Sequence, residues 1–198
     1  MSTIAVLGNG RVGSNLAQAL TTAGHEVTVT DRTPGAAADA ARTAQIVINA
    51  TPGAGSLERL TALREELRGK ILVDVSNATT DGPDGLPANL IYSGSSLAER
   101  LQHALPDTHV VKTLNTMLFM VMTAPGQLST SPTAYLSAND EQAKKTVTGL
   151  LTDLGWDPAW IEDLGDITTA RATEAMILIV PHIIRRNGFT PFAVSLAR

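Results

Sequence analysis

The N-terminal residues place two short apolar runs on either side of a helical pattern. Residues 3–7 are mostly apolar, and from Val12 to Ala23 apolar side chains return every three or four positions until Gly24. A second apolar and β-branched run follows at residues 27–30. This order predicts a strand, a helix and a strand, with the two strands parallel and the crossover right-handed.

The same alternation of short apolar runs and helical patterns continues to residue 154. Strands are predicted at residues 46–50, 71–75, 109–113 and 133–137, the last of which is expected to be the final strand of the sheet. Helices are predicted at residues 36–44, 56–67, 97–105 and 140–154, while residues 77–89 contain Asp-Gly-Pro-Asp-Gly and predict turns. The pattern is typical of the α/β class, with a Rossmann-type doubly wound parallel sheet.

The C-terminal residues have a different character. Asp166 is a candidate N-cap for a long helix over residues 166–187. Pro181 is expected to kink this helix and Gly188 to end it. The predicted domains are a Rossmann domain at residues 1–157 and, continuous with it, a small C-terminal helical lobe at residues 158–198.

Residues 175–184 of this helix are apolar on almost every side. A small lobe offers too little surface to bury such a helix, so we predict that it packs against a second copy of the chain as a homodimer. The apolar run is shorter than the roughly 20 residues that span a bilayer, and we expect no membrane partner. Arg171 and Glu174 lie one helical turn apart and predict an i,i+3 ion pair.

Composition and charge narrow the functional classes. Hydrophobic residues make up 43% and charged residues 17% of the 198 residues, a balance typical of a folded globular chain. The formal net charge is -4 and no stretch concentrates lysine and arginine, so we expect no nucleic-acid partner. The chain has no cysteine and no basic-then-apolar leader, which predicts a cytoplasmic protein without a metal site or a thiolate nucleophile.

A glycine-rich turn joins the first predicted strand to the first helix. It reads GNGRVG at residues 8–13 and matches G-x-G-x-x-G, a pattern that turns tightly, admits a diphosphate and packs helix on strand. Free amides and the helix dipole would attract that diphosphate, and the flanking strand and helix make a turn without a ligand the weaker alternative. The expected cofactor-binding residues of this turn are Gly8, Asn9, Gly10, Arg11, Val12 and Gly13.

The residues after the second strand bear on which dinucleotide binds. Asp31 would hydrogen-bond the ribose hydroxyls of the adenosine and repel a 2′-phosphate, which favours NAD. Arg32 and Thr33 offer a guanidinium and a hydroxyl, groups that bind such a phosphate, which favours NADP. These residues alone favour NAD by a small margin.

The loops that follow the other strands supply further candidates, because open α/β sheets bind ligands beyond the carboxyl ends of their strands. We expect the apolar members to pack on the nicotinamide and the polar ones to orient its carboxamide or the acceptor, unless they cap the next helix. Asn115 and Thr116 are the candidates for aligning the hydride path. The full set is Thr51 and Pro52, then Asn77, then Asn115, Thr116 and Met117.

Two further stretches are more specific than the glycine turn. Residues 110–116 read VVKTLNT, and residues 163–174 read DLGDITTARATE at the start of the last helix. Together with the glycine turn, and over nearly the whole chain, they resemble the coenzyme F420-dependent NADP oxidoreductases and their actinobacterial relatives. The resemblance implies NADP in the Rossmann half and a deazaflavin stacked on the nicotinamide under the C-terminal lobe, with hydride passing directly between them. Such chemistry needs alignment and exclusion of water rather than an acid–base pair.

The sequence departs from the family pattern at two positions. Asp31 replaces a small polar residue and weakens the implied preference for NADP, and Asn115 stands where some members carry histidine. We therefore predict an oxidoreductase that uses NADP, with NAD as the alternative, and an acceptor that is F420, a flavin or a small unsaturated compound. The rival functions are a dinucleotide-sensing module without turnover and an imine or β-hydroxyacid dehydrogenase, a class that usually carries a longer C-terminal domain.

Overall fold

The computed structural model describes residues 1–197, which fold around one mostly parallel sheet. Seven strands lie in the order β2-β1-β3-β4-β7-β8-β9, and the first five of these are parallel. The chain moves outward from β1 to β2 and then returns past β1 to β3, which is the predicted doubly wound topology. The parallel strands are β1 (Thr3–Leu7), β2 (Glu26–Thr30), β3 (Ile46–Asn49), β4 (Ile71–Asp74) and β7 (His109–Lys112).

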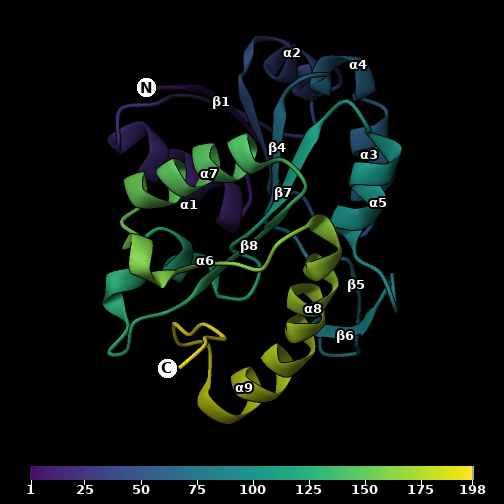
Figure 1. Cartoon of the computed structure of the whole chain (residues 1–198). Helices are drawn as coiled ribbons and strands as arrows, with labels where there is room; N and C mark the ends of the chain where they lie inside the picture. Colours follow the sequence, from purple (N-terminus) through teal and green to yellow (C-terminus); the bar gives the residue numbers. More distant parts are fainter. Residues whose placement is uncertain (198) are drawn as a thin grey trace.

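Helices cover both faces of this sheet (Figure 1). One face holds α1 (Arg11–Thr22) and α7 (Glu141–Asp153), and the other holds α2 (Ala36–Thr43), α3 (Ser56–Thr61), α4 (Arg64–Leu67) and α5 (Leu97–Ala104). Alternate residues of β1 reach opposite cores, because Ile4 and Val6 pack with α1 while Ala5 and Leu7 pack with the second set of helices. Burial of both faces explains why the central strands read as continuous apolar runs.

Two predictions between residues 56 and 90 need correction. The helix predicted at residues 56–67 is two short helices, α3 and α4, with a break between them. Residues 77–89, predicted as turns, belong largely to an antiparallel hairpin of β5 (Thr79–Asp81) and β6 (Pro87–Leu90). Its strands are short and mostly solvent-facing, so they lack the apolar alternation by which a strand is predicted.

The prediction that residues 133–137 form the last strand of the sheet is wrong. β8 (Ala134–Ala138) pairs antiparallel with β7, and β9 (Ile161–Asp163) then pairs parallel with β8. The sheet therefore extends past residue 157, where the predicted Rossmann domain ends. A three-residue strand that reads IED is too short and too acidic to give a hydrophobic signal.

A C-terminal helical run follows β9 and lies beyond the carboxyl ends of the parallel strands (Figure 1). Asp166 is confirmed as its N-cap, since its carboxylate accepts the backbone N–H of Thr168 at 2.9 Å. Pro181 has no N–H to donate to the carbonyl of Ile177, and the residues just before it tighten into a 3-10 turn. Gly188, with a φ of 73°, ends the run. Its parts are η3 (Ile167–Thr169), α8 (Ala170–Ala175), η4 (Met176–Ile179) and α9 (Val180–Asn187).

The predicted ion pair between Arg171 and Glu174 is wrong. Arg171 binds Glu99 of α5 instead, and Glu174 binds Lys112 of β7. The run of residues 167–187 is 21 residues long, and its most apolar 18-residue window has a mean hydropathy of 1.3, so by length and composition it could cross a membrane, contrary to expectation. Its most apolar stretch is 33% buried within the chain, and its acidic residue faces the sheet. The cytoplasmic location stays a prediction.

Candidate functional site

A cleft of about 1080 Å³ lies at the carboxyl ends of the five parallel strands. This volume exceeds the roughly 300–1,000 Å³ of most small-molecule sites, and the position is where open α/β sheets bind ligands. Fifteen predicted site residues were expected at this edge, and twelve of them line the cleft. They are Gly8, Asn9, Gly10, Arg11 and Val12 after β1, Asp31 and Arg32 after β2, Thr51 and Pro52 after β3, Asn77 after β4, and Asn115 and Met117 after β7.

Three other predicted residues lie beside the cleft rather than in its lining: Gly13, Thr33 and Thr116. A Cβ at Gly13 would lie 1.8 Å from the carbonyl oxygen of Gly8, so this glycine lets α1 pack closely on β1. Thr33 donates its backbone N–H to Asp31. Thr116 is buried, and its hydroxyl has no hydrogen-bond partner among the described residues.

The glycine turn presents open backbone to this cleft. Gly10 caps α1 without a side chain, the first turn of α1 holds no acidic residue, and a Cβ at Gly10 would meet nothing within 4 Å. Gly8 has a φ of 106°, and a Cβ there would lie 2.8 Å from the carbonyl oxygen of Ala50, so the turn requires glycine at this position. The free amides at the start of α1 and the positive end of its dipole fit a diphosphate in charge and in shape.

Arg11 is held between two aromatic rings at the rim of the cleft. Its guanidinium carbon lies 5.8 Å from the ring centre of Phe119 and 5.5 Å from that of Phe189. Each such contact is worth about 0.5–1 kcal/mol at an exposed site. Phe189 follows α9, so the C-terminal segment returns to the glycine turn, which the sequence did not predict. The stack keeps a positive charge close to the open amides.

At the end of β2, Asp31 is engaged by its own loop. Its carboxylate accepts the backbone N–H of Thr33 at 2.8 Å, and hydrogen bonds from the side chain and backbone of Thr33 hold the pKa of Asp31 below its ordinary value of 3.8. The carboxylate is therefore ionised at neutral pH. Arg32 is exposed, and within residues 1–197 it forms no ion pair with Asp31, so its guanidinium is available to an anion.

Three loops in direct contact wall the opposite end of the cleft. Asn77 donates its side-chain amide to the carbonyl of Asn115 at 2.8 Å, and Asn115 donates its own amide to Oδ1 of Asn77 at 2.9 Å. A Cβ at Gly53 would lie 2.1 Å from the carbonyl oxygen of Asn77, so the loop after β3 depends on glycine here. Leu114 has a φ of 59°, which is rare for a residue with a side chain, and it turns the chain just before Asn115. The side-chain amides of the two asparagines thus form hydrogen bonds with each other and with the loop backbone.

Arg59 of α3 also lines the cleft, although no sequence pattern indicated it. Its Nη2 donates to the carbonyl of Pro52 at 2.5 Å, to that of Ala54 at 3.2 Å and to Oγ1 of Thr51 at 3.3 Å. Thr51 in turn donates its hydroxyl to Oδ1 of Asn49 at 2.6 Å. Two of its partners are backbone carbonyls, which leave no trace in a sequence, and two are the hydroxyls of Thr51 and Ser56. The arginine therefore closes the loop after β3.

A buried ion network adjoins the wall formed by these loops. Nζ of Lys112 lies 2.8 Å from Oδ2 of Asp74 and 2.9 Å from Oε1 of Glu174, and it also donates to the carbonyl of Ser76. Burial alone would lower the pKa of Lys112, but the two carboxylates outweigh burial and raise it above its ordinary value. The lysine is therefore charged. The sequence gave no sign of this network, because a lysine at the end of a strand is usually solvated.

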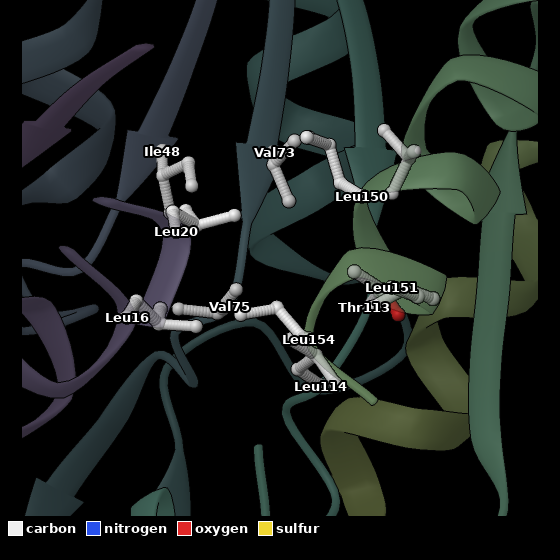
Figure 2. A pocket seen from close by; sticks show the side chains of 11 residues that line it. Leu16, Leu20, Ile48, Val73, Val75, Thr113, Leu114, Leu150, Leu151 and Leu154 are labelled. Carbon is white, nitrogen blue, oxygen red and sulfur yellow. The ribbon is translucent and has the colours of Figure 1, made fainter. Parts of the chain in front are cut away.

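A second cavity belongs to the core rather than to the site. Figure 2 shows Leu16 and Leu20 of α1 and Leu151 of α7 pointing toward one another around a void of about 20 Å³. A void of this size can hold at most a water molecule. Thr113 also lines it, and its buried hydroxyl has no hydrogen-bond partner in the described part of the chain. We therefore assign no ligand to this void.

The N-terminal part of the chain matches a known family. A family model described as NADP oxidoreductase, coenzyme F420-dependent, matches residues 3–54, which include the glycine turn. The F420-dependent NADP reductase of Methanocaldococcus jannaschii is 29% identical over 150 residues, which are 75% of this chain and 65% of that protein. The chain thus spans slightly less than two thirds of the length of this relative.

Solved structures extend the similarity to the whole chain. A protein from Arthrobacter sp. FB24, provisionally named an F420-dependent NADP reductase, is 38% identical with a TM-score of 0.91, and the match covers 100% of both chains. An imine reductase from Streptomyces aurantiacus is 16% identical with a TM-score of 0.63, covering 92% of this chain and 61% of its own. The second likeness shows a shared fold and nothing more.

Proposed function

The chain belongs to the family of coenzyme F420-dependent NADP oxidoreductases and is an oxidoreductase, and on that premise we propose that it exchanges hydride between NADP(H) and a deazaflavin or flavin-like acceptor. The observation that carries the proposal is the open glycine turn in a cleft of about 1080 Å³, which is larger than most small-molecule sites. Bound NADPH supplies a hydride and becomes NADP⁺, while the acceptor gains that hydride and a proton from solvent.

In this proposal the dinucleotide lies across the carboxyl ends of β1 and β2. The N–H groups at the start of α1 bind the diphosphate, and the stacked Arg11 adds positive charge. Arg32 binds the 2′-phosphate, and the hydroxyl of Thr33 joins it once that hydroxyl turns away from Asp31. The objection is the charge of Asp31, which the hydrogen bonds from Thr33 keep in place, so the binding of the phosphate by Arg32 must outweigh that repulsion.

Calorimetric titration with NADP⁺ and NAD⁺ tests this assignment. We expect the wild type to prefer NADP⁺, and Arg32→Ala to lose at least about tenfold affinity for NADP⁺ alone, because a hydrogen bond to a charged group is worth about 1.5–3 kcal/mol. Asp31→Ser should bind NADP⁺ more tightly, since it removes a like charge. An equal loss of both cofactors in Arg32→Ala, or an unchanged preference in Asp31→Ser, would contradict the assignment.

The lining of the cleft favours an acceptor that needs no protein acid. Among the described residues that line it, the ionisable side chains are Arg11, Asp31, Arg32 and Arg59. Hydride transfer between two cofactors needs contact and exclusion of water, whereas reduction of a carbonyl or an imine is helped by a positioned proton donor. We therefore place a deazaflavin or flavin ahead of an imine or a hydroxyacid as the second substrate.

An absorbance assay of NADPH oxidation with F420, FMN and a cyclic imine separates the candidates. Turnover with F420 or FMN supports the proposal. Turnover with the imine alone would move the protein to the imine-reductase class, whose fold it shares. Tight NADP⁺ binding without turnover of any acceptor would instead support a dinucleotide-sensing module.

A further inference from the structure

The ion network of Lys112, Asp74 and Glu174 is almost fully withdrawn from water, with exposed fractions of 1%, 0% and 3%. Its charges do not cancel, because one ammonium faces two carboxylates. Replacing a buried ion network by apolar side chains of the same volume often leaves stability unchanged or improved. A gain in stability is therefore a poor explanation for this network. A better explanation is that the network fixes the positions of the segments that it joins.

On one side the network holds the loop after β4. Oδ1 of Asp74 accepts the hydroxyl of Ser76 at 2.8 Å and the side-chain amide of Asn49 at 2.9 Å, while Lys112 donates to the carbonyl of Ser76. Ser76 lines the cleft, and the next residue, Asn77, joins this loop to the loop after β7. A change at Lys112 therefore reaches the wall of the cleft through one short loop.

On the other side the network holds the C-terminal helical run. Oε2 of Glu174 accepts the N–H of Leu97 at 3.0 Å, and Oε1 accepts the N–H of Ala98 at 3.2 Å and lies 2.9 Å from Nζ of Lys112. Every partner is a donor, which suits the acceptor oxygens of a carboxyl group. The two amides belong to the first turn of α5, whose dipole offsets the excess negative charge. The network thus ties α8 to α5 and to β7.

We propose that Lys112 is a positioning residue for hydride transfer, which fixes the loop of Ser76 and Asn77 relative to α8 and the C-terminal lobe. The inference rests on the proposed function, since it concerns the end of the cleft formed by the loops of Asn77 and Asn115, where we expect the nicotinamide and the acceptor. Lys112 does not line the cleft and acts through Ser76. None of the described contacts of the network involves the glycine turn, so its loss impairs ring alignment more than binding.

Lys112→Met tests the proposal, because methionine is nearly as long as lysine and carries no charge. Lys144→Met is the matched control, since Lys144 is 6% exposed and lies 2.8 Å from Asp163 and 2.6 Å from Glu141 but does not line the cleft. Ser76→Ala keeps Lys112, removes only the hydroxyl that donates to Asp74 and accepts from Asn49, and serves if Lys112→Met fails to fold. The measurements are the melting temperature, the Kd for NADP⁺, the fluorescence emission of bound NADPH and kcat with F420.

We expect Lys112→Met to lower kcat by at least about tenfold, because a small misplacement of reacting groups can cost up to about 10²-fold. The emission of bound NADPH should shift toward that of the free cofactor. The Kd for NADP⁺ should change by less than roughly threefold, because sites that share no contacts affect each other only slightly. Ser76→Ala should show a smaller decrease in kcat and a smaller shift of the emission of bound NADPH. Unchanged kcat and emission, or equal losses in Lys144→Met, would overturn the inference. If the wild type turns over neither F420 nor FMN, the proposed function fails, and the emission shift alone decides the role of Lys112.

Discussion

Gly10→Ala should weaken NADP⁺ binding without unfolding the protein. Gly10 has a φ of -73° and a ψ of -173°, which any residue can adopt, and a Cβ there meets nothing within 4 Å. Alanine is a poor N-cap, but that costs only about 1 kcal/mol. The new methyl group would occupy the open face over which the diphosphate must approach the amides. Losing one hydrogen bond to a charged group costs about 1.5–3 kcal/mol, or roughly 10- to 150-fold in Kd.

Gly13→Ala is the matched substitution in the same turn, and it should act on stability instead. Its Cβ would lie 1.8 Å from the carbonyl oxygen of Gly8, so the helix or the strand must move by about 1.5 Å to restore ordinary contact. Alanine gains about 1 kcal/mol over glycine in helix propensity. Overpacking costs about 1–3 kcal/mol or more, and here the neighbour is rigid backbone, so the clash prevails.

Urea denaturation and calorimetric titration measure the two effects separately. We expect Gly10→Ala to unfold within about 1 kcal/mol of the wild type and to bind NADP⁺ at least about tenfold more weakly. Gly13→Ala should lose about 2 kcal/mol without any ligand present, a large share of a typical 5–15 kcal/mol. Wild-type affinity in Gly10→Ala would show that the diphosphate does not lie on these amides. Wild-type stability in Gly13→Ala would refute the close packing of α1.

Three further outcomes follow from single groups. Thr113→Val should stabilise the protein by about 1 kcal/mol in urea denaturation, because it removes a buried hydroxyl without a partner; a loss would indicate a bound water instead. The pKa of Lys112 is raised in the folded protein, so the stabilisation by its charged ammonium is complete below about pH 10.4, the ordinary pKa of lysine. This stabilisation disappears as the pH rises through the pKa of Lys112 in the folded protein, and the difference in stability between the wild type and Lys112→Met should shrink over that range. We also propose a homodimer through the C-terminal run, where Ile179 is 48% exposed; Ile179→Glu should halve the mass in light scattering, and a monomeric wild type would contradict this.

The parts of the fold that could be predicted are set by residues that are close in the sequence, within one helical turn or one strand. The apolar spacing of α1, the glycine turn and the N-cap Asp166 each depend on a few adjacent residues. Parallel strands also deliver their following loops to one edge, so Asp31, Asn77 and Asn115 could be placed in one cleft without knowing their partners. Local pattern and sheet topology together were therefore sufficient to locate the cleft.

The parts that could not be predicted depend on contacts between distant segments. Glu174 binds Lys112 rather than Arg171, one turn away, because the sheet presents a buried ammonium that no helix pattern can indicate. The hairpin of β5 and β6 was hidden by solvent-facing strands, and β9 by its three-residue length. In each case the missing information is a partner, and a sequence pattern shows only what a segment does by itself.

The C-terminal segment joins the two predicted domains more closely than their sequences indicate. Val194 donates its N–H to the carbonyl of Thr116 at 2.9 Å, so the residues after α9 pair with the loop after β7. Phe189 contacts Arg11 at the glycine turn, while the buried carboxylate of α8 binds the lysine of β7. The C-terminal lobe is therefore joined to the glycine turn, to the loop after β7 and to Lys112. Moving the lobe away from the sheet would break both an aromatic contact and a buried ion pair, and the ion pair is the costlier of the two to break.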